Sequence, residues 1–151
     1  MKAAMAKWLR NIRGAVLMGL AWAGVWAPIG LLIGLIVDSD GAMDEMWAAV
    51  GGYPGFLCGA VFFTVLGVSE GRLRFDELPL SRVCAKGSTS GVLVGMLPFV
   101  LGSIETGVLP VWLLGVLIIV SITLLSAVSA AGSLALAKWW RRKNSSTPVM
   151  A

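Results

Sequence analysis

The sequence contains no histidine, two cysteines and few charged residues, and each shortage excludes a class of protein. Histidine is the commonest metal ligand and the commonest general base, so most metal-centred and acid–base chemistry has no side chain to carry it. Charged residues make up 13% of the 151 residues, whereas an average soluble domain has roughly a quarter. A surface that faces water on all sides cannot be built from this composition, so the chain is predicted to form a single integral membrane domain.

Catalytic constellations are also missing from the sequence. An intramembrane protease needs a serine with a histidine or lysine partner, paired aspartates or a zinc-binding motif, and no such set is present. There is no glycine-rich phosphate loop and no cluster of cysteines. Cys58 and Cys84 fall at depths that differ by on the order of 15 Å, too far for a disulfide, and act as small apolar residues. We therefore expect no enzymatic activity and no cofactor.

All twelve lysines and arginines lie in three clusters, within residues 2–13, 72–86 and 138–143. The other two polar breaks carry only acids, one between residues 38 and 45 and the other at Glu105. Basic and acid-only breaks therefore alternate, as expected for a chain that crosses a bilayer four times with its basic segments in the cytoplasm. This pattern predicts a multi-pass protein of a cell (inner) membrane with both termini cytoplasmic. Its basic residues are expected to meet anionic lipid headgroups rather than nucleic acid.

The apolar segments predict an all-α fold, a four-helix transmembrane bundle with short loops. Their expected limits are residues 14–37, 46–68, 82–104 and 108–137, followed by a disordered tail over residues 144–151. A span needs about 20 apolar residues, and the strongly apolar part of the third segment, residues 91–104, is shorter. This segment spans only if its helix begins near Ser81, with Ser81 as the N-cap and Lys86 reaching back to the interface. A three-span alternative would leave residues 138–143 outside, against the charge rule.

Small residues recur at every fourth position in the expected helices, which places them on one helix face and lets backbones approach closely. One interpretation is that these faces pack the bundle into a compact monomer. The other is that at least one stripe, most readily Gly51, Gly55 and Gly59, forms the interface of a homo-oligomer around a pore. Ser88, Thr89 and Ser90 would then be the first candidates for its lining. The glycines expected to pack helices are Gly19, Gly30, Gly34, Gly51, Gly55, Gly59, Gly87, Gly91 and Gly95.

The most informative water-facing stretch is the loop over residues 69–86, in which charges alternate in sign while Phe75 and Leu78 stay apolar. A solvated cytoplasmic loop explains its arginines, and an exposed pair such as Arg74 with Asp76 would contribute less than about 1 kcal/mol. The alternative is a docking surface for a cytoplasmic protein partner or for anionic lipid. The residues expected to make such contacts are Arg72, Arg74, Phe75, Asp76, Glu77 and Arg82.

The run Gly-Arg-Leu-Arg-Phe-Asp-Glu-Leu at residues 71–78, followed by a glycine-striped span, resembles small bacterial membrane proteins with four predicted helices and no characterised activity. The similarity covers mainly residues 69–95. It implies a bacterial inner membrane, and it carries no catalytic role over to this chain.

Transporters usually place an ionisable residue inside a span, and none is visible here. In length and helix number the chain is similar to small multidrug transporters, but these need a carboxylate in the first helix, and residues 14–37 contain none. Proton-coupled antiport is therefore not expected. We expect a non-catalytic membrane protein that scaffolds or binds a partner through residues 69–86. The alternative function is a small oligomeric channel or lytic pore.

Overall fold

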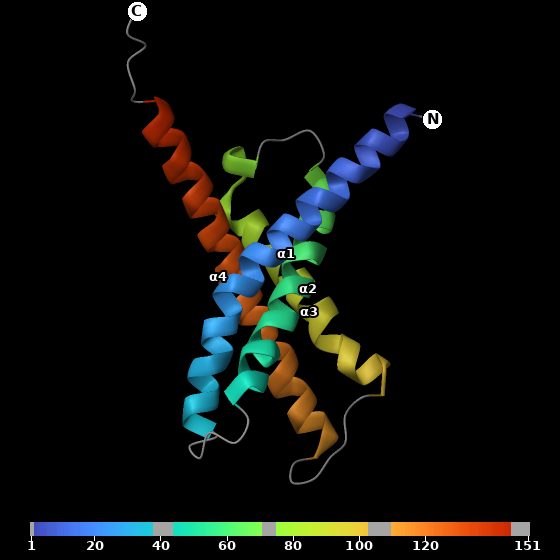
Figure 1. Cartoon of the computed structure of the whole chain (residues 1–151), viewed down its shortest axis with the longest axis vertical. Coiled ribbons are helices and arrows are strands. Elements are labelled where there is room, and N and C mark those ends of the chain that lie inside the picture. The colour runs from blue at the N-terminus through green and yellow to red at the C-terminus, as the bar shows by residue number, and fades with distance from the viewer. Residues whose placement is uncertain (1, 38–43, 71–74, 103–109, 146–151) are drawn as a thin grey trace, which may run out of the picture.

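A computed structural model describes residues 2–37, 44–70, 75–102 and 110–145. The described elements are α1 (Lys2–Val37), α2 (Asp44–Glu70), the short 3-10 helix η1 (Phe75–Glu77), α3 (Leu80–Val100) and α4 (Val111–Ser145) (Figure 1). These parts of the chain contain no strand, which confirms the expected all-α fold. Within them, four helices are long and apolar enough to cross a membrane.

The first and last helices are longer than the apolar segments inside them. α1 begins at Lys2 rather than near residue 14, because the alanine, lysine, methionine and leucine residues before the apolar run favour a helix. α4 begins at Val111 rather than residue 108, directly after Pro110, and continues through the basic cluster to Ser145. The expected disordered tail is therefore wrong for its first two residues, which are helical, and its remainder lies outside the described residues.

Both ends of α3 differ from the expected limits for a local reason. The helix begins directly after Pro79, whose carbonyl accepts the N–H groups of Arg82 (3.1 Å) and Val83 (3.3 Å). Ser81 lies inside the first turn, so its expected role as N-cap is wrong. At the other end, Gly102 adopts a φ of 65° two residues after the last helical residue, a left-handed conformation that ends a helix at low cost. The helix therefore ends at Val100, short of the expected limit, and residues 103 and 104 lie outside the described residues.

The helices pair into two hairpins, α1 with α2 and α3 with α4, and glycines line both contacts. A Cβ on Gly30 would overlap the carbonyl oxygen of Trp47, and a Cβ on Gly51 would overlap that of Trp26. In the second hairpin, Gly91 lies against the main chain at Thr123 in the same way. Only a hydrogen atom fits at these points, so the helix backbones approach closely. The close approach gives dispersion contacts between the helices, which help to hold them together where the hydrophobic effect cannot.

The two hairpins cross near the middle of the molecule, and α1 and α4 diverge on either side of this crossing (Figure 1). Figure 1 shows α1 crossing α4, with α1 and α2 on one side and α3 and α4 on the other near the lower edge of the view. The buried apolar core lies between the hairpins. Its residues are Trp22, Trp26, Cys58, Phe62, Leu78, Val83, Val94, Ala130 and Leu134.

The described basic side chains gather at one end of the molecule. α1 begins and α4 finishes at the same end, which also holds η1 and the start of α3 (Figure 1). We call this the basic end, and the opposite end, where α1 finishes and α4 begins, the far end. The described lysine and arginine side chains at the basic end are Arg10, Arg13, Arg82, Lys86, Lys138, Arg141, Arg142 and Lys143.

Candidate functional site

The segment predicted to dock a partner is folded back onto the bundle at the basic end. Of its expected contact residues, Arg72 and Arg74 lie outside the described residues. Phe75 is half-buried, and its ring meets that of Phe62 edge-on with the centroids 6.2 Å apart. Leu78 is buried. The apolar side chains of this segment therefore face the core, and we call residues 75–79 the strap.

Charged contacts tie the strap to the end of α4. Arg141 Nη1 lies 2.5 Å from Asp76 Oδ2 and 3.8 Å from Glu77 Oε1. Lys138 Nζ donates to the carbonyl oxygen of Leu78 at 3.4 Å. Among the described residues of the segment, the charged side chains that stay exposed are those of Glu77 and Arg82. The contacts bring the middle and last basic clusters together.

An ion pair joins the two hairpins near the strap. Lys86 Nζ lies 3.3 Å from Glu70 Oε1 and donates to Ser69 Oγ at 2.5 Å. The two charged side chains are shielded, with 17% of Lys86 and 11% of Glu70 exposed. Shielding strengthens such a pair relative to one in open solvent, so the contact fixes the end of α2 against α3.

Two tryptophan–serine hydrogen bonds cross from α1 to α4. Trp22 Nε1 donates to Ser133 Oγ at 3.2 Å, and Trp26 Nε1 donates to Ser129 Oγ at 2.8 Å. Donors and acceptors are each four residues apart, so both pairs lie one helical turn apart on facing sides. These bonds satisfy indole N–H groups that would otherwise be buried unpaired, and they fix the angle between the hairpins.

A second polar cluster joins α3 to α4 inside the core. The hydroxyls of Ser90 and Ser126 both donate to the carbonyl oxygen of Gly87 at 2.7 Å, and the two hydroxyls lie 2.9 Å apart. Cys58 of α2 is fully buried in the same core. The hydroxyl of Thr123 is buried and has no hydrogen-bond partner among the described residues. Ser90 and Ser126 are both fully buried.

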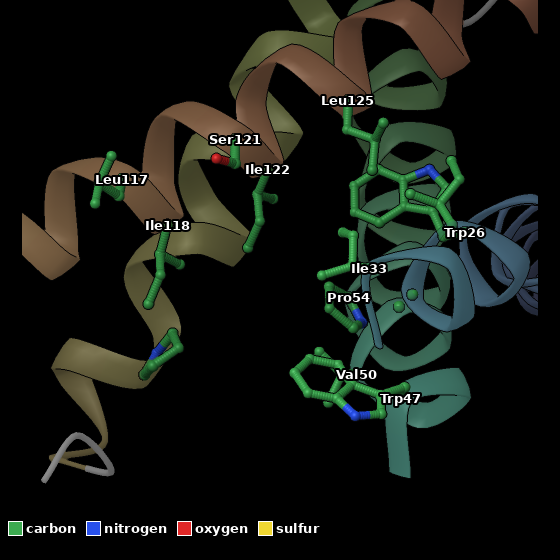
Figure 2. A pocket seen from close by; sticks show the side chains of 14 residues that line it. Trp26, Ile33, Trp47, Val50, Pro54, Leu117, Ile118, Ser121, Ile122 and Leu125 are labelled. Carbon is green, nitrogen blue, oxygen red and sulfur yellow. The ribbon is translucent and has the colours of Figure 1, made fainter. Parts of the chain in front are cut away.

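A cavity of about 510 Å³ lies between the hairpins in the half nearer the far end. Figure 2 shows Trp26 and Leu125 close together at its closed end, while Trp47 and Leu117 stand apart at its wide end. One wall comes from α1 and α2, and the opposite wall comes from α3 and α4. The cavity follows from the crossing of the hairpins, which the tryptophan–serine bonds fix at the closed end.

The cavity lining decides what the site can hold. None of the lining residues carries a charge, and the side chains with a polar atom are Ser121, Trp26 and Trp47. The N–H of Trp26 is already donated to Ser129. No group of three or more possible metal-binding side chains lies together in the described part of the chain. A volume of this size and an apolar lining are typical of sites for hydrophobic molecules, and the lining offers neither a nucleophile with a base nor a cation site.

Each glycine expected to pack helices lies inside a hairpin contact. Gly55 lies against the side chain of Trp26, and Gly59 lies against the backbone at Met18. Gly51, Gly55 and Gly59 thus all face α1, and in this structure the stripe is not available to a second copy. The remaining members of the set, Gly19, Gly34, Gly87 and Gly95, contact Phe56, Trp47, Ala130 and Ile119 respectively.

Sequence reasoning missed the cavity and the bonds that cross between hairpins. The bonded residues are separated by 111 and 103 positions, so no local pattern joins them. One signal was present: tryptophans four apart on one apolar helix and serines four apart on another can form two parallel bonds. The cavity has no comparable signal, because it depends on the angle at which two hairpins cross.

Comparisons of the chain with protein-family models, with curated proteins and with solved structures found no match. The resemblance of residues 69–95 to small bacterial membrane proteins therefore stays a prediction.

Proposed function

We propose that this chain is a non-catalytic integral membrane protein that holds a hydrocarbon chain of a lipid in the cavity between its hairpins. The cavity itself carries this proposal. It has a volume of about 510 Å³, and its uncharged lining comes from all four helices, which suits an apolar, elongated molecule. The four helices could place that lining at the depth of the hydrocarbon, since each is long and apolar enough to cross a membrane.

Physical chemistry favours hydrocarbon over the other possible contents of the cavity. An empty space would forfeit dispersion contacts along both walls. A water molecule needs two to four polar partners, and the lining offers few such groups. A lipid tail at the same depth meets neither cost. Because lipid and lining are equally apolar, the tail is held by fit rather than by a hydrophobic driving force.

The orientation that supports this proposal has the basic end in the cytoplasm. Positively charged segments beside membrane spans are retained on the cytoplasmic side, and the described basic side chains gather at one end. Both termini would then be cytoplasmic, anionic headgroups would meet the basic end, and the cavity would lie in the outer leaflet. A bacterial inner membrane is the setting that the sequence resemblance suggests.

The orientation is tested by reporter fusions. We expect a reporter that is active only outside the cytoplasm to give signal when it is inserted at residues 38–43, and none when it follows Arg142. The charge rule is the reason for both expectations. Signal after Arg142 together with silence at residues 38–43 would reverse the orientation and move the cavity to the inner leaflet.

Lipid retention tests the cavity. In Ile118→Trp the indole ring of the introduced tryptophan fills part of the cavity from the α4 wall. We therefore expect the protein to retain a phospholipid at least about tenfold more weakly, a loss of roughly 1.4 kcal/mol in binding free energy. The measurement is native mass spectrometry of the protein in mild detergent, titrated with a dioleoyl phospholipid. Val50→Trp makes the same change from the opposite wall.

Val120→Trp is the matched control, because Val120 lies on α4 with 50% of its surface exposed and is not among the residues that line this cavity. It should retain lipid as the unaltered protein does. Equal retention in all three variants, or none in the unaltered protein, would contradict the proposed function. Circular dichroism of each variant shows whether it is folded.

The two functions expected from the sequence stay predictions. Docking of a cytoplasmic partner would use the outward groups at the strap. An oligomeric pore would need a stripe or hydroxyl face other than those used within the hairpins. Among its expected lining residues, Ser90 is buried in the core cluster, and Thr89 donates to the carbonyl oxygen of Ala85.

A further inference from the structure

A column of four aromatic rings runs from the cavity to the strap. Trp26 lines the closed end of the cavity, and its ring centroid lies 6.4 Å from that of Trp22. Trp22 stacks on Phe62 at 5.2 Å, and Phe62 meets the ring of Phe75 at 6.2 Å. All three separations lie within the range of about 4.5–7 Å over which aromatic rings interact. This aromatic column is a continuous contact between the far-end cavity and the first residue of the strap.

The column is confined along most of its length. Trp22, Trp26 and Phe62 are 3%, 2% and 0% exposed. The backbone of α1 at Trp26 is pressed against Gly51, so the helix itself has no space to shift toward α2. Well-packed interiors transmit displacement instead of absorbing it. Trp26 is the ring of the column that also lines the cavity, so it is the ring that a molecule in the cavity would touch.

We propose that occupancy of the cavity is transmitted along the aromatic column to the strap, so that the basic end responds to what fills the far end. This inference rests on the proposed function. A lipid tail in the cavity adds contacts at the edge of Trp26 and further restricts the motion of the ring. The restriction passes through Trp22 and Phe62 to Phe75, which then holds the strap in place for more of the time.

The strap is the part of the structure best suited to respond. It is a short 3-10 turn, and its ion pair uses Arg141, whose side chain is 53% exposed, so this pair adds little to docking. Phe75, the buried side chain of Leu78 and the bond from Lys138 to the Leu78 carbonyl also hold the strap against the bundle. When the strap opens, the side chain of Leu78 becomes accessible beside the carboxylates of Asp76 and Glu77. When the strap is packed against the bundle, the side chain of Leu78 is hidden. Cavity occupancy would thus control a surface in the cytoplasm.

Hydrogen–deuterium exchange of the strap amides tests the coupling. The measurement uses the full chain in mild detergent, with and without a dioleoyl phospholipid, and native mass spectrometry records binding on the same samples. We expect bound lipid to slow exchange at residues 76–78 at least about fivefold, the lower end of typical coupling between sites. In Phe62→Leu, which interrupts the column, lipid should still bind but exchange at the strap should not slow.

Phe63→Leu is the matched control, because its ring lies against α1 at Gly14 and not in the column; it should behave as the unaltered protein. Phe75→Leu interrupts the column at its half-buried end and replaces Phe62→Leu if that variant does not fold. In Phe75→Leu, too, lipid should bind without slowing exchange at the strap. Lipid that binds without slowing the strap, or full slowing in the interrupted variants, would overturn the coupling and leave the proposed function intact. Absence of bound lipid in the unaltered protein would overturn both.

Discussion

Gly51→Val is expected to destabilise the folded chain by about 3 kcal/mol or more, since overpacking a tight contact typically costs about 1–3 kcal/mol and this site has less room than most. The reason is that a Cβ at Gly51 would overlap the carbonyl oxygen of Trp26 and crowd the backbone of Gly30. Neither neighbour is the flexible end of a side chain, so relief requires α1 and α2 to move apart. The measurement is the free energy of reversible unfolding in mixed detergent micelles.

Gly67→Val is the control on the same helix. A Cβ at Gly67 meets nothing within 4 Å, so the added side chain projects away from the bundle. Valine is also a somewhat better helix former than glycine, and stability should therefore change by less than about 0.5 kcal/mol or rise slightly. Equal losses in the two variants would mean that α1 and α2 do not pack through this stripe.

Trp26→Ala is expected to cost about 3–5 kcal/mol, the usual range for removing a large buried aromatic side chain. Trp26 is 2% exposed, stacks on Trp22 and bonds to Ser129 across the hairpins. Its loss removes the closed end of the cavity as well as the contact that fixes the hairpin angle. Thermal unfolding in detergent, followed by circular dichroism, measures the effect.

Two further variants separate the contributions of Trp26. Trp26→Phe keeps most of the ring and removes the indole N–H, so it should cost only about 1 kcal/mol, a typical value for a hydrogen bond between helices in a membrane. Trp8→Ala removes the same side chain from a site on α1 that is 63% exposed, and should change stability by less than about 0.5 kcal/mol. A loss in Trp8→Ala as large as in Trp26→Ala would contradict the position of Trp26 at the centre of the fold.

The helices could be predicted from the sequence because their signal is local. An apolar run of sufficient length between charged breaks defines a spanning helix whatever it packs against, and spacing of four defines a helix face. The limits that differed, at Ser81, Gly102 and Ser145, depend on proline, on a left-handed glycine and on helix-favouring polar residues beyond the apolar run. These determinants are local too, but hydropathy does not report them.

The site could not be predicted, because its determinants are not local. The expected docking loop was identified by its charges, yet Phe75 and Leu78 turn inward because the open inner faces of the hairpins need apolar cover. Asp76 pairs with Arg141, which lies 65 positions away on α4, so no local pattern joins the two residues. The partner suggested by the sequence, Arg74, lies outside the described residues. The cavity arises where two hairpins diverge, and its lining residues are ordinary apolar residues of four separate helices.

The most direct test of the cavity as a lipid site is to map where a lipid tail touches the protein. The measurement uses vesicles that contain the full chain and a phospholipid with a photoreactive diazirine in its tail, followed by digestion and mass spectrometry. We predict that labelling concentrates on cavity residues such as Ile118 and Ile122, exceeds that on Leu124, which is 63% exposed on the outer face of α4, and falls in Val50→Trp. Labelling that follows exposure alone, with Leu124 above Ile118 and Ile122 and no change in Val50→Trp, would contradict the account.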